Sequence, residues 1–112
     1  MKITYANSNV EKCFTDYRIM KKHLPFEWVR NIKKHMDRLA AAECFGDFLA
    51  LGLGKPERLN GYANIRYSLH VSANARLIIE PNATQDTVMT CTEIEVEGVI
   101  DYHGSKENRY IT

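Results

Sequence analysis

The sequence has few of the features that mark secreted, membrane-spanning or metal-binding proteins. Its three cysteines form no Cys-x-x-Cys pair, and no cysteine and histidine have the spacing of zinc ligands. No apolar run approaches the roughly 20 residues that cross a bilayer, and residues 1–5 lack the apolar core of a signal peptide. We therefore expect free thiols, no metal or other cofactor, no membrane association and a cytoplasmic location.

Strong charge of one sign is also missing. The chain has 15 Lys and Arg against 14 Asp and Glu, so its net charge is +1, whereas nucleic-acid-binding domains are usually clearly basic. The charges are nevertheless divided unevenly. Residues 1–66 hold 12 basic and 7 acidic residues, a net +5, and residues 67–112 hold 3 and 7, a net −4. This distribution predicts a basic helical half and an acidic strand half.

Hydrophobic periodicity predicts helices in the first half of the chain and strands in the second, and 112 residues fit one domain. A short strand is predicted at 2–6. A first helix follows at 10–20 and begins with a capping box, Ser8-x-x-Glu11. A second helix is predicted at about 25–43, and the residues expected to face the core are Val29, Ile32, Met36, Leu39 and Ala40. Then follow a helical turn at 45–51, a polar loop at 55–65, strands at 66–71, 76–80 and 88–103, a tight turn at 72–75 and a bulge at Gly98. The order β-α-α-β-β-β predicts an α+β fold with two helices on one side of an antiparallel sheet.

Three groups of polar residues are candidates for a shared site at one end of this sheet. They are the loop Lys55, Glu57 and Arg58 with Arg66, the strand residue Arg76, and the strand end Asp101, Tyr102 and His103. In an antiparallel sheet the start of one strand lies beside the end of its neighbour, so we expect Arg76 near His103. Histidine, tyrosine and aspartate can move the protons in metal-independent RNA cleavage, while arginine donates to phosphate oxygens. Alternatively, the basic residues are merely solvated, or Arg76 pairs with Asp101 or Glu80.

Other prominent side chains have structural interpretations. His23 and His35 lie on helical segments and are expected at the surface, and His70 is expected to be structural or half-exposed within its strand. Phe26 and Trp28 begin the second helix and are either core residues or a patch that a partner covers.

Several short segments of the sequence, taken in order along the chain, resemble the HigB-type killer proteins, a branch of the RelE/ParE superfamily of bacterial toxins. The opening strand, Asn7 and the following Val-Glu-Lys-Cys at 10–13 are similar to the start of those proteins. The later matches, in the family's order, are residues 39–43, 59–61, 66–69, 75–81 and the Asp-Tyr-His ending at 101–103. The resemblance covers residues 1–103 as the toxin domain, and residues 104–112 extend beyond it as a tail that we expect to be mobile.

The resemblance implies a compact RelE-like fold and a toxin of a type II toxin–antitoxin pair that cleaves mRNA on the ribosome. It also implies a helix-turn-helix, HigA-like antitoxin as partner. By position it assigns phosphate contact to Arg76, and catalysis to the Asp101, Tyr102 and His103 group. It places Lys55 and Arg58 in a loop that faces RNA, and we add the neighbouring Arg66 to these RNA-binding candidates.

Two features depart from the family. Glu57 stands where members often carry a histidine, and a carboxylate repels the phosphate backbone. The nearly neutral net charge, with Glu93, Glu95 and Glu97 on the last predicted strand, also weakens binding to RNA. Two alternatives therefore stay open. One is a toxin of the same superfamily that acts on a protein target such as gyrase, and the other is an inactive domain that only binds an antitoxin-like regulator.

Overall fold

The computed structural model describes residues 1–103 and 106–112. Within these residues the chain is α+β, with four α-helices and a mixed sheet of six strands. In chain order the elements are β1 (Lys2–Tyr5), α1 (Ser8–Thr15), α2 (Tyr17–Met20), α3 (Phe26–Ala41), α4 (Phe45–Ala50), β2 (Glu57–Leu59), β3 (Arg66–His70), β4 (Ala75–Pro81), the 3₁₀ turn η1 (Val88–Thr90), β5 (Glu93–His103) and β6 (Lys106–Ile111). No helix in this described part has both the length and the apolar composition that a membrane span needs.

Side-chain caps set where the first helices begin. Asn7, rather than the predicted Ser8, is the N-cap of α1, and its Oδ1 accepts a hydrogen bond of 2.9 Å from the Val10 amide. Both residue types cap helices well, but only the residue whose backbone is still extended can reach back over the free amides. Asp16 then ends α1 and caps α2 by accepting from the Arg18 amide. The helix predicted over 10–20 is therefore two short helices joined at Asp16.

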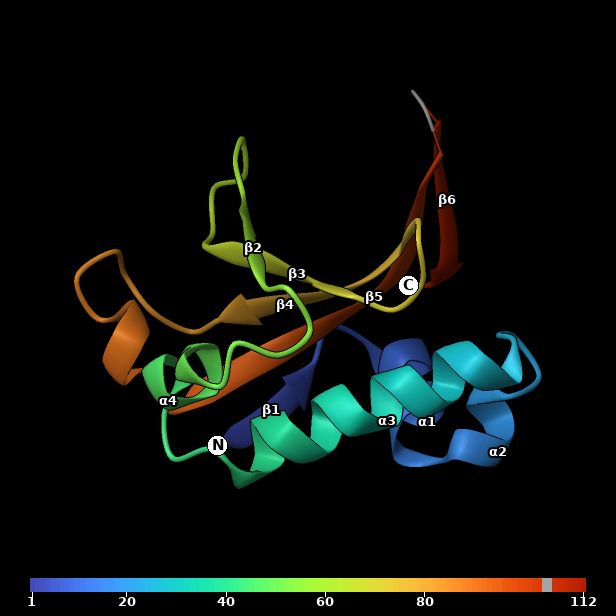
Figure 1. Cartoon of the computed structure of the whole chain (residues 1–112), viewed down its shortest axis with the longest axis horizontal. Coiled ribbons are helices and arrows are strands. Elements are labelled where there is room, and N and C mark those ends of the chain that lie inside the picture. The colour runs from blue at the N-terminus through green and yellow to red at the C-terminus, as the bar shows by residue number, and fades with distance from the viewer. Residues whose placement is uncertain (104–105) are drawn as a thin grey trace.

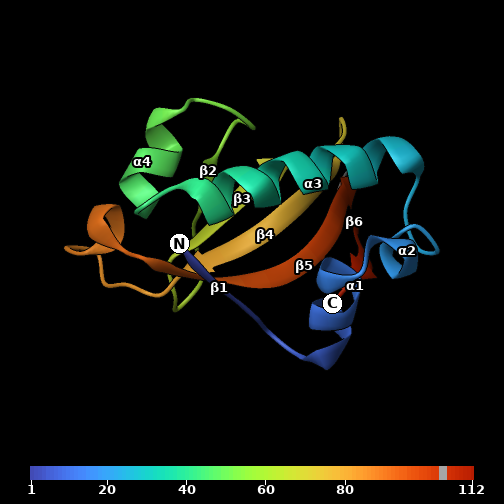
Figure 2. The ribbon, with the colours of Figure 1, turned by 90° about the horizontal axis from the view of Figure 1, so that it is seen from below.

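The long helix α3 covers one side of the sheet, and Figure 2 shows it crossing β3, β4 and β5. Its predicted inner face is confirmed at Val29, Ile32, Met36 and Leu39, which are all buried, whereas Ala40 is exposed. The sheet completes the core with Tyr67, Leu69, Leu77, Ile79, Val96 and Val99. Burial of this apolar surface is what holds the helical layer to the sheet.

His35 belongs to this interface, so the expectation of a surface histidine was wrong. It is 4% exposed, and its Nε2 lies 2.6 Å from the carbonyl oxygen of His70, which requires Nε2 to carry the proton and donate it. Gly54 lies against the ring with a φ of +77°, and a Cβ there would come within 2.5 Å of Cε1 of His35. Burial lowers the pKa of His35. A neutral imidazole thus ties α3 to β3 and to the loop that contains Gly54.

The sheet is built around β5, its longest strand. The strand order is β1-β5-β4-β3-β2, and β6 pairs with β5 off this path. The predicted antiparallel pairing of β3, β4 and β5 is confirmed, but β1 runs parallel to β5, so the expectation of a fully antiparallel sheet was wrong. Helices separate β1 from every other strand, and such a long connection permits parallel pairing, which a tight hairpin does not. The loop predicted at 55–65 also contributes the short edge strand β2.

The last residues form a strand, in contrast to the mobile tail that we expected. β6 pairs antiparallel with the second half of β5, and Ile111 lies buried opposite Val99. The side chain of Asn9 on α1 donates to the carbonyl of Thr112 at 3.0 Å, which ties the end of β6 to the helical layer. Gly98 makes room for this strand, because a Cβ there would overlap the Ile111 carbonyl. The predicted bulge at Gly98 is confirmed by a register shift in the β4–β5 pair.

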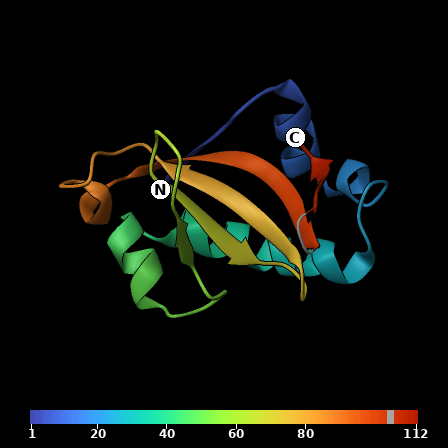
Figure 3. The same ribbon diagram turned by 90° about the horizontal axis from the view of Figure 1, so that it is seen from above.

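The two sides of the sheet differ in what covers them. In Figure 1 the helices lie below the sheet, while β2 with the loop after it and the β5–β6 end rise above it. Figure 3, from the opposite side to Figure 2, shows β3, β4 and β5 in front of the long helix. We call this side of the three strands, away from α3, the open face. Because both ends of the sheet rise around it, the open face is concave.

If β6 is an integral part of the fold, Ile111→Ala will lower the free energy of unfolding by about 2–4 kcal/mol, the usual cost of deleting a buried aliphatic side chain. Urea unfolding followed by circular dichroism measures this change. The matched control is Thr112→Ala at the exposed neighbouring position, which should change stability by less than about 0.5 kcal/mol. Equal, small effects of the two substitutions would show that β6 adds nothing to the fold.

Candidate functional site

The open face carries two groups of charged side chains that the strand register aligns. Residues directly opposite one another on paired strands present their side chains on the same face. The first group lies near the β3–β4 turn, and we call it the basic row: the successively opposite residues His70, Arg76, Ile100 and Arg109. The second group, the glutamate cluster, consists of Glu80, Glu95 and Glu97. Arg66 lies beside the cluster.

Lys55 extends the basic row from the loop before β2. It lines a shallow hollow of about 400 Å³ together with His70. Partial burial and the nearby charges of Arg76 and Lys55 lower the pKa of His70, and Glu57 acts in the opposite direction. His70 is half-exposed, as expected. Its imidazole is therefore neutral at physiological pH and able to accept a proton.

Arg76 is held by the turn between β3 and β4. Its Nη1 donates to the carbonyl oxygens of Ser72, Ala73 and Ala75 at 3.0–3.2 Å. These acceptors are neutral, so they orient the guanidinium without cancelling its charge. Among the described side chains Arg76 forms no ion pair, which leaves the alternative of a pair with Asp101 or Glu80 unsupported.

Asp101 lies on the opposite face of the sheet from Arg76. It stands opposite Ala75, which is fully buried beneath the helices. Its Oδ2 accepts a hydrogen bond of 3.0 Å from the hydroxyl of Tyr110, and the Tyr110 ring packs edge-on against Trp28 of α3 with 5.1 Å between centroids. The structure therefore does not bring Asp101 and Arg76 together, because their positions alternate across the pleat.

Tyr102 and His103 complete the predicted catalytic group. Their backbone ends β5 opposite Glu107 and Lys106 of β6. Their side chains lie outside the described residues. The expected closeness of His103 to Arg76 stays a prediction.

The three predicted RNA-binding residues do not share one surface. Lys55 is exposed in the loop beside His70. Arg58 stands opposite Tyr67, whose ring is in the core, so Arg58 projects from the helical side of the sheet edge. Arg66 is on the open face, where carboxylates surround it. Only Lys55 of the three adds charge to the basic row.

Arg66 is bound by two glutamates and an aromatic ring. Its Nε donates to Oε2 of Glu80 at 2.7 Å, and its Nη2 lies 3.6 Å from Oε1 of Glu97. The guanidinium carbon lies 4.4 Å from the centre of the Tyr62 ring, a cation–π geometry. Burial disfavours the charge of Arg66, but the bond and charge of Glu80 outweigh this and raise its pKa. Arg66 thus serves first to neutralise the acidic side of the open face.

The glutamate cluster gathers three carboxylates whose oxygens lie within 4.8 Å of one another. Carboxylates at this distance can hold a cation, and here Arg66 already supplies a positive charge to two of them. Burial, the bond to Glu95 and the charge of Glu80 raise the pKa of Glu97 to about 8. Like charges so close cannot all be ionised cheaply. Glu97 is therefore largely protonated at neutral pH.

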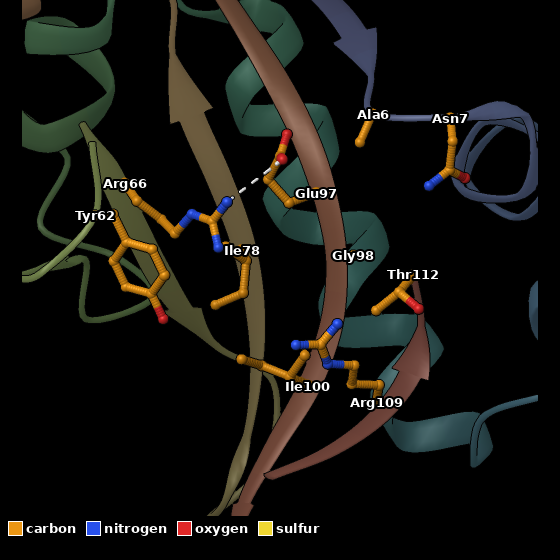
Figure 4. Close-up of a pocket in the computed structure, with 10 residues that line it drawn as sticks. All are labelled: Ala6, Asn7, Tyr62, Arg66, Ile78, Glu97, Gly98, Ile100, Arg109 and Thr112. Atoms are coloured by element: carbon orange, nitrogen blue, oxygen red, sulfur yellow. Dashed lines mark ion pairs between the residues drawn. The ribbon is translucent and has the colours of Figure 1, made fainter. Parts of the chain in front are cut away.

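A hollow of about 260 Å³ lies between the basic row and the glutamate cluster (Figure 4). Tyr62 and Arg66 stand on one side of it and Arg109 on the other. Its floor is formed by Ile78, Gly98 and Ile100. Glu97 also lines the hollow, so the open face has guanidinium groups at both edges of a floor that carries one carboxyl group.

The sequence predicted only part of this arrangement. Two predicted site residues, Arg66 and Arg76, are on the open face. The alternation of apolar and polar residues along the predicted strand at 66–71 placed His70 on the side away from the core, and this pattern was a signal for its position on the open face. The prediction missed Arg109, because residues 104–112 were expected to lie outside the fold. The place of Arg109 depends on the pairing of β6 with β5, which the sequence pattern of these residues did not show.

The raised pKa of Glu97 predicts a specific dependence of stability on pH. The folded carboxyl keeps its proton up to about pH 8, whereas the unfolded one loses it near the ordinary value of 4.5. Folding therefore binds a proton between these values, and this contribution to stability is present at low pH and lost as the pH rises through the window. Glu97→Gln removes this titration. It should flatten the decline in unfolding free energy between pH 5 and 8 by about 1 kcal/mol or more, as measured by urea unfolding at several pH values.

The exposed Glu11→Gln variant is the control and should keep the wild-type pH profile. A Glu97→Gln protein whose stability declines as steeply as the wild type would contradict the raised pKa.

Comparison of the chain with protein-family models, with curated proteins and with solved structures found no match. An assignment of function must therefore be argued from the residues and the geometry of the open face.

Proposed function

We propose that this chain is a cytoplasmic toxin of a type II toxin–antitoxin pair, related to the HigB-type branch of the RelE/ParE superfamily, which cleaves mRNA on the ribosome. The observation that carries the proposal is the basic row on a concave sheet face. His70, Arg76 and Arg109 stand there on β3, β4 and β6, with Ile100 of β5 between the two arginines. A concave surface lined by cationic side chains can follow the phosphate backbone of a single strand. The order of the HigB-like motifs in the sequence supports the same conclusion.

The proposed reaction needs no metal. The 2′-oxygen of one nucleotide attacks the adjacent phosphorus and forms a P–O2′ bond, while the P–O5′ bond breaks. A base takes the proton of the 2′-hydroxyl, and an acid gives a proton to the leaving 5′-oxygen, so the products are a cyclic phosphate and a 5′-hydroxyl. The resemblance places the catalytic group at Asp101, Tyr102 and His103 at the end of β5, and of these we propose Tyr102 and His103 for the two proton transfers.

Arg76 is suited to stabilise the phosphorane. All three of its described hydrogen bonds use Nη1, which leaves donors on Nη2 and Nε for phosphate oxygens. The turn carbonyls hold the group in place before RNA arrives. Such preorganised charge is the main means by which enzymes stabilise a developing negative charge.

The proposed partners are the ribosome, mRNA and a helix-turn-helix antitoxin of the HigA type. An antitoxin that covers the basic row would block the RNA site directly. Phe26, at the start of α3, is 64% exposed, and the Trp28 next to it packs on Tyr110. The apolar patch expected at these two residues is therefore reduced to Phe26.

A toxin without ribonuclease activity is the second candidate. Asp101, one of the predicted catalytic residues, faces the helices and accepts a hydrogen bond from Tyr110. Arg66, one of the predicted RNA-binding residues, is engaged by glutamates. Both observations favour a surface that binds a protein target, such as gyrase, over a complete nuclease site.

Expression in a bacterial host separates the two candidates. The wild type should stop growth and produce new cuts in translated mRNA, mapped by sequencing of RNA 5′ ends. Arg76→Ala and His103→Ala should each reduce the cutting by about 100-fold or more, the usual range for loss of a proton-transfer or charge-stabilising group. Arg30→Ala, an exposed arginine on α3, is the matched control and should cut like the wild type.

Growth arrest without RNA cuts would favour the protein-target candidate. Normal growth with soluble, folded wild-type protein would contradict both toxin proposals.

A further inference from the structure

The hollow over Gly98 has the size and lining of a site for a small planar ligand. Its volume of about 260 Å³ is below the roughly 300–1,000 Å³ of pockets for drug-sized ligands. It is nevertheless larger than the volume that several water molecules occupy in the liquid, at about 30 Å³ each. It is separate from the β3–β4 turn, where the proposed cleavage site lies. The hollow is lined by residues of both the basic row and the glutamate cluster.

One side of the hollow is a platform formed by Tyr62 and Arg66. The guanidinium carbon of Arg66 lies 4.4 Å from the centre of the Tyr62 ring, and Glu80 and Glu97 hold the guanidinium in place. Tyr62 is itself 46% exposed. Nucleobases stack on aromatic rings and on guanidinium planes alike. A platform that is already ordered loses little side-chain entropy when a base binds.

The floor combines two apolar side chains with a glycine, and Glu97 also lines the hollow. Ile78 and Ile100 are buried, and between them Gly98 has a φ of +145°, a conformation that other residues rarely adopt. The Ile111 carbonyl occupies the position of a Cβ at Gly98, so the backbones of β5 and β6 lie close together beside this floor. This floor suits the face of a base or a ribose, because neither needs hydrogen bonds there.

The other side of the hollow carries a positive charge. Arg109 projects from β6 opposite Ile100, and its exposed side chain borders the hollow across from the platform (Figure 4). A guanidinium in this position can donate two parallel hydrogen bonds to a phosphate. The proton on Glu97 limits the negative charge that a phosphate would meet on the floor.

We propose that the hollow over Gly98 binds one nucleotide of single-stranded RNA, with its base against the Tyr62–Arg66 platform and its phosphate at Arg109. This inference deepens the proposed function, on which its choice of RNA as ligand rests. The site holds a nucleotide that flanks the cleaved bond and fixes the register of the strand along the open face. It requires Arg109 of β6, which lies outside the part of the chain that resembles the HigB-type proteins.

Nuclear magnetic resonance titration of the full chain tests the site without any toxin assay. The probes are adenosine 5′-monophosphate, adenosine, inorganic phosphate and a pentamer of adenylate. The monophosphate and the pentamer should shift the amide signals of Gly98, Ile100 and Arg109, and the pentamer should bind more tightly. Tyr62→Ala and Arg109→Gln should each weaken binding by about five-fold or more, while the control Arg30→Gln leaves it unchanged.

Several results would overturn the proposal. Inorganic phosphate that binds as well as the monophosphate would show an anion site only. A pentamer that binds no more tightly than the monophosphate would show a site for a free nucleotide rather than RNA. Unchanged binding by Tyr62→Ala would remove the platform. Tyr62→Phe, which keeps the ring, should bind like the wild type, and equal losses in both Tyr62 variants would also contradict stacking.

The growth assay keeps this inference distinct from the proposed function. A wild type that cuts mRNA while Tyr62→Ala and Arg109→Gln cut equally well would leave the toxin proposal standing and reject the nucleotide site. A wild type that binds the pentamer at Gly98 but neither stops growth nor cuts RNA would support the site and reject the toxin proposal.

Discussion

The bulge of β5 at Gly98 is the constraint on which the rest of the structure depends. β5 is the strand to which β1, β4 and β6 all pair, and it must bend where its partner along one edge changes from β1 to β6. Only glycine fits there, because φ is +145° and the Ile111 carbonyl occupies the space of a Cβ. The bend makes the open face concave and leaves the hollow above Gly98. A bulge is thus used here to shape a surface as well as to end a pairing.

The fold also redistributes charge. The sequence predicted a polar molecule with a basic helical half and an acidic strand half, but the sheet places residues of the two halves side by side. Nζ of Lys2 in β1 lies 3.3 Å from Oε1 of Glu93 in β5. Arg66 of β3 donates a hydrogen bond to Glu80 of β4. Two ion pairs therefore join the basic half of the sequence to the acidic half within the sheet. On the open face the arginines of the basic row stand apart from the glutamate cluster, so that even a nearly neutral chain has a surface with guanidinium groups.

The candidate site is built from different supports at its two ends. At the β3–β4 turn, neutral carbonyls hold Arg76 and leave its charge available. At the other end, carboxylates bind Arg66 and neutralise its charge, while the plane of its guanidinium group remains as a surface for stacking. The same residue type therefore serves phosphate contact in one place and base contact in the other. This division follows from whether the neighbours of each arginine are dipoles or charges.

The sequence by itself determined the α+β class, the inner face of α3, the β3–β4 hairpin and the bulge at Gly98, because each depends on local periodicity or on one residue's backbone preference. Only the tertiary structure decided that β1 runs parallel to β5, that His35 is buried, and that residues 106–111 complete the sheet. It also decided that Asp101 turns away from Arg76 while Arg109 shares its face. The parallel pairing of β1 with β5 and the burial of His35 against β3 depend on contacts between segments that are distant in the chain, and the spacing of residues in a sequence carries no direct record of such contacts.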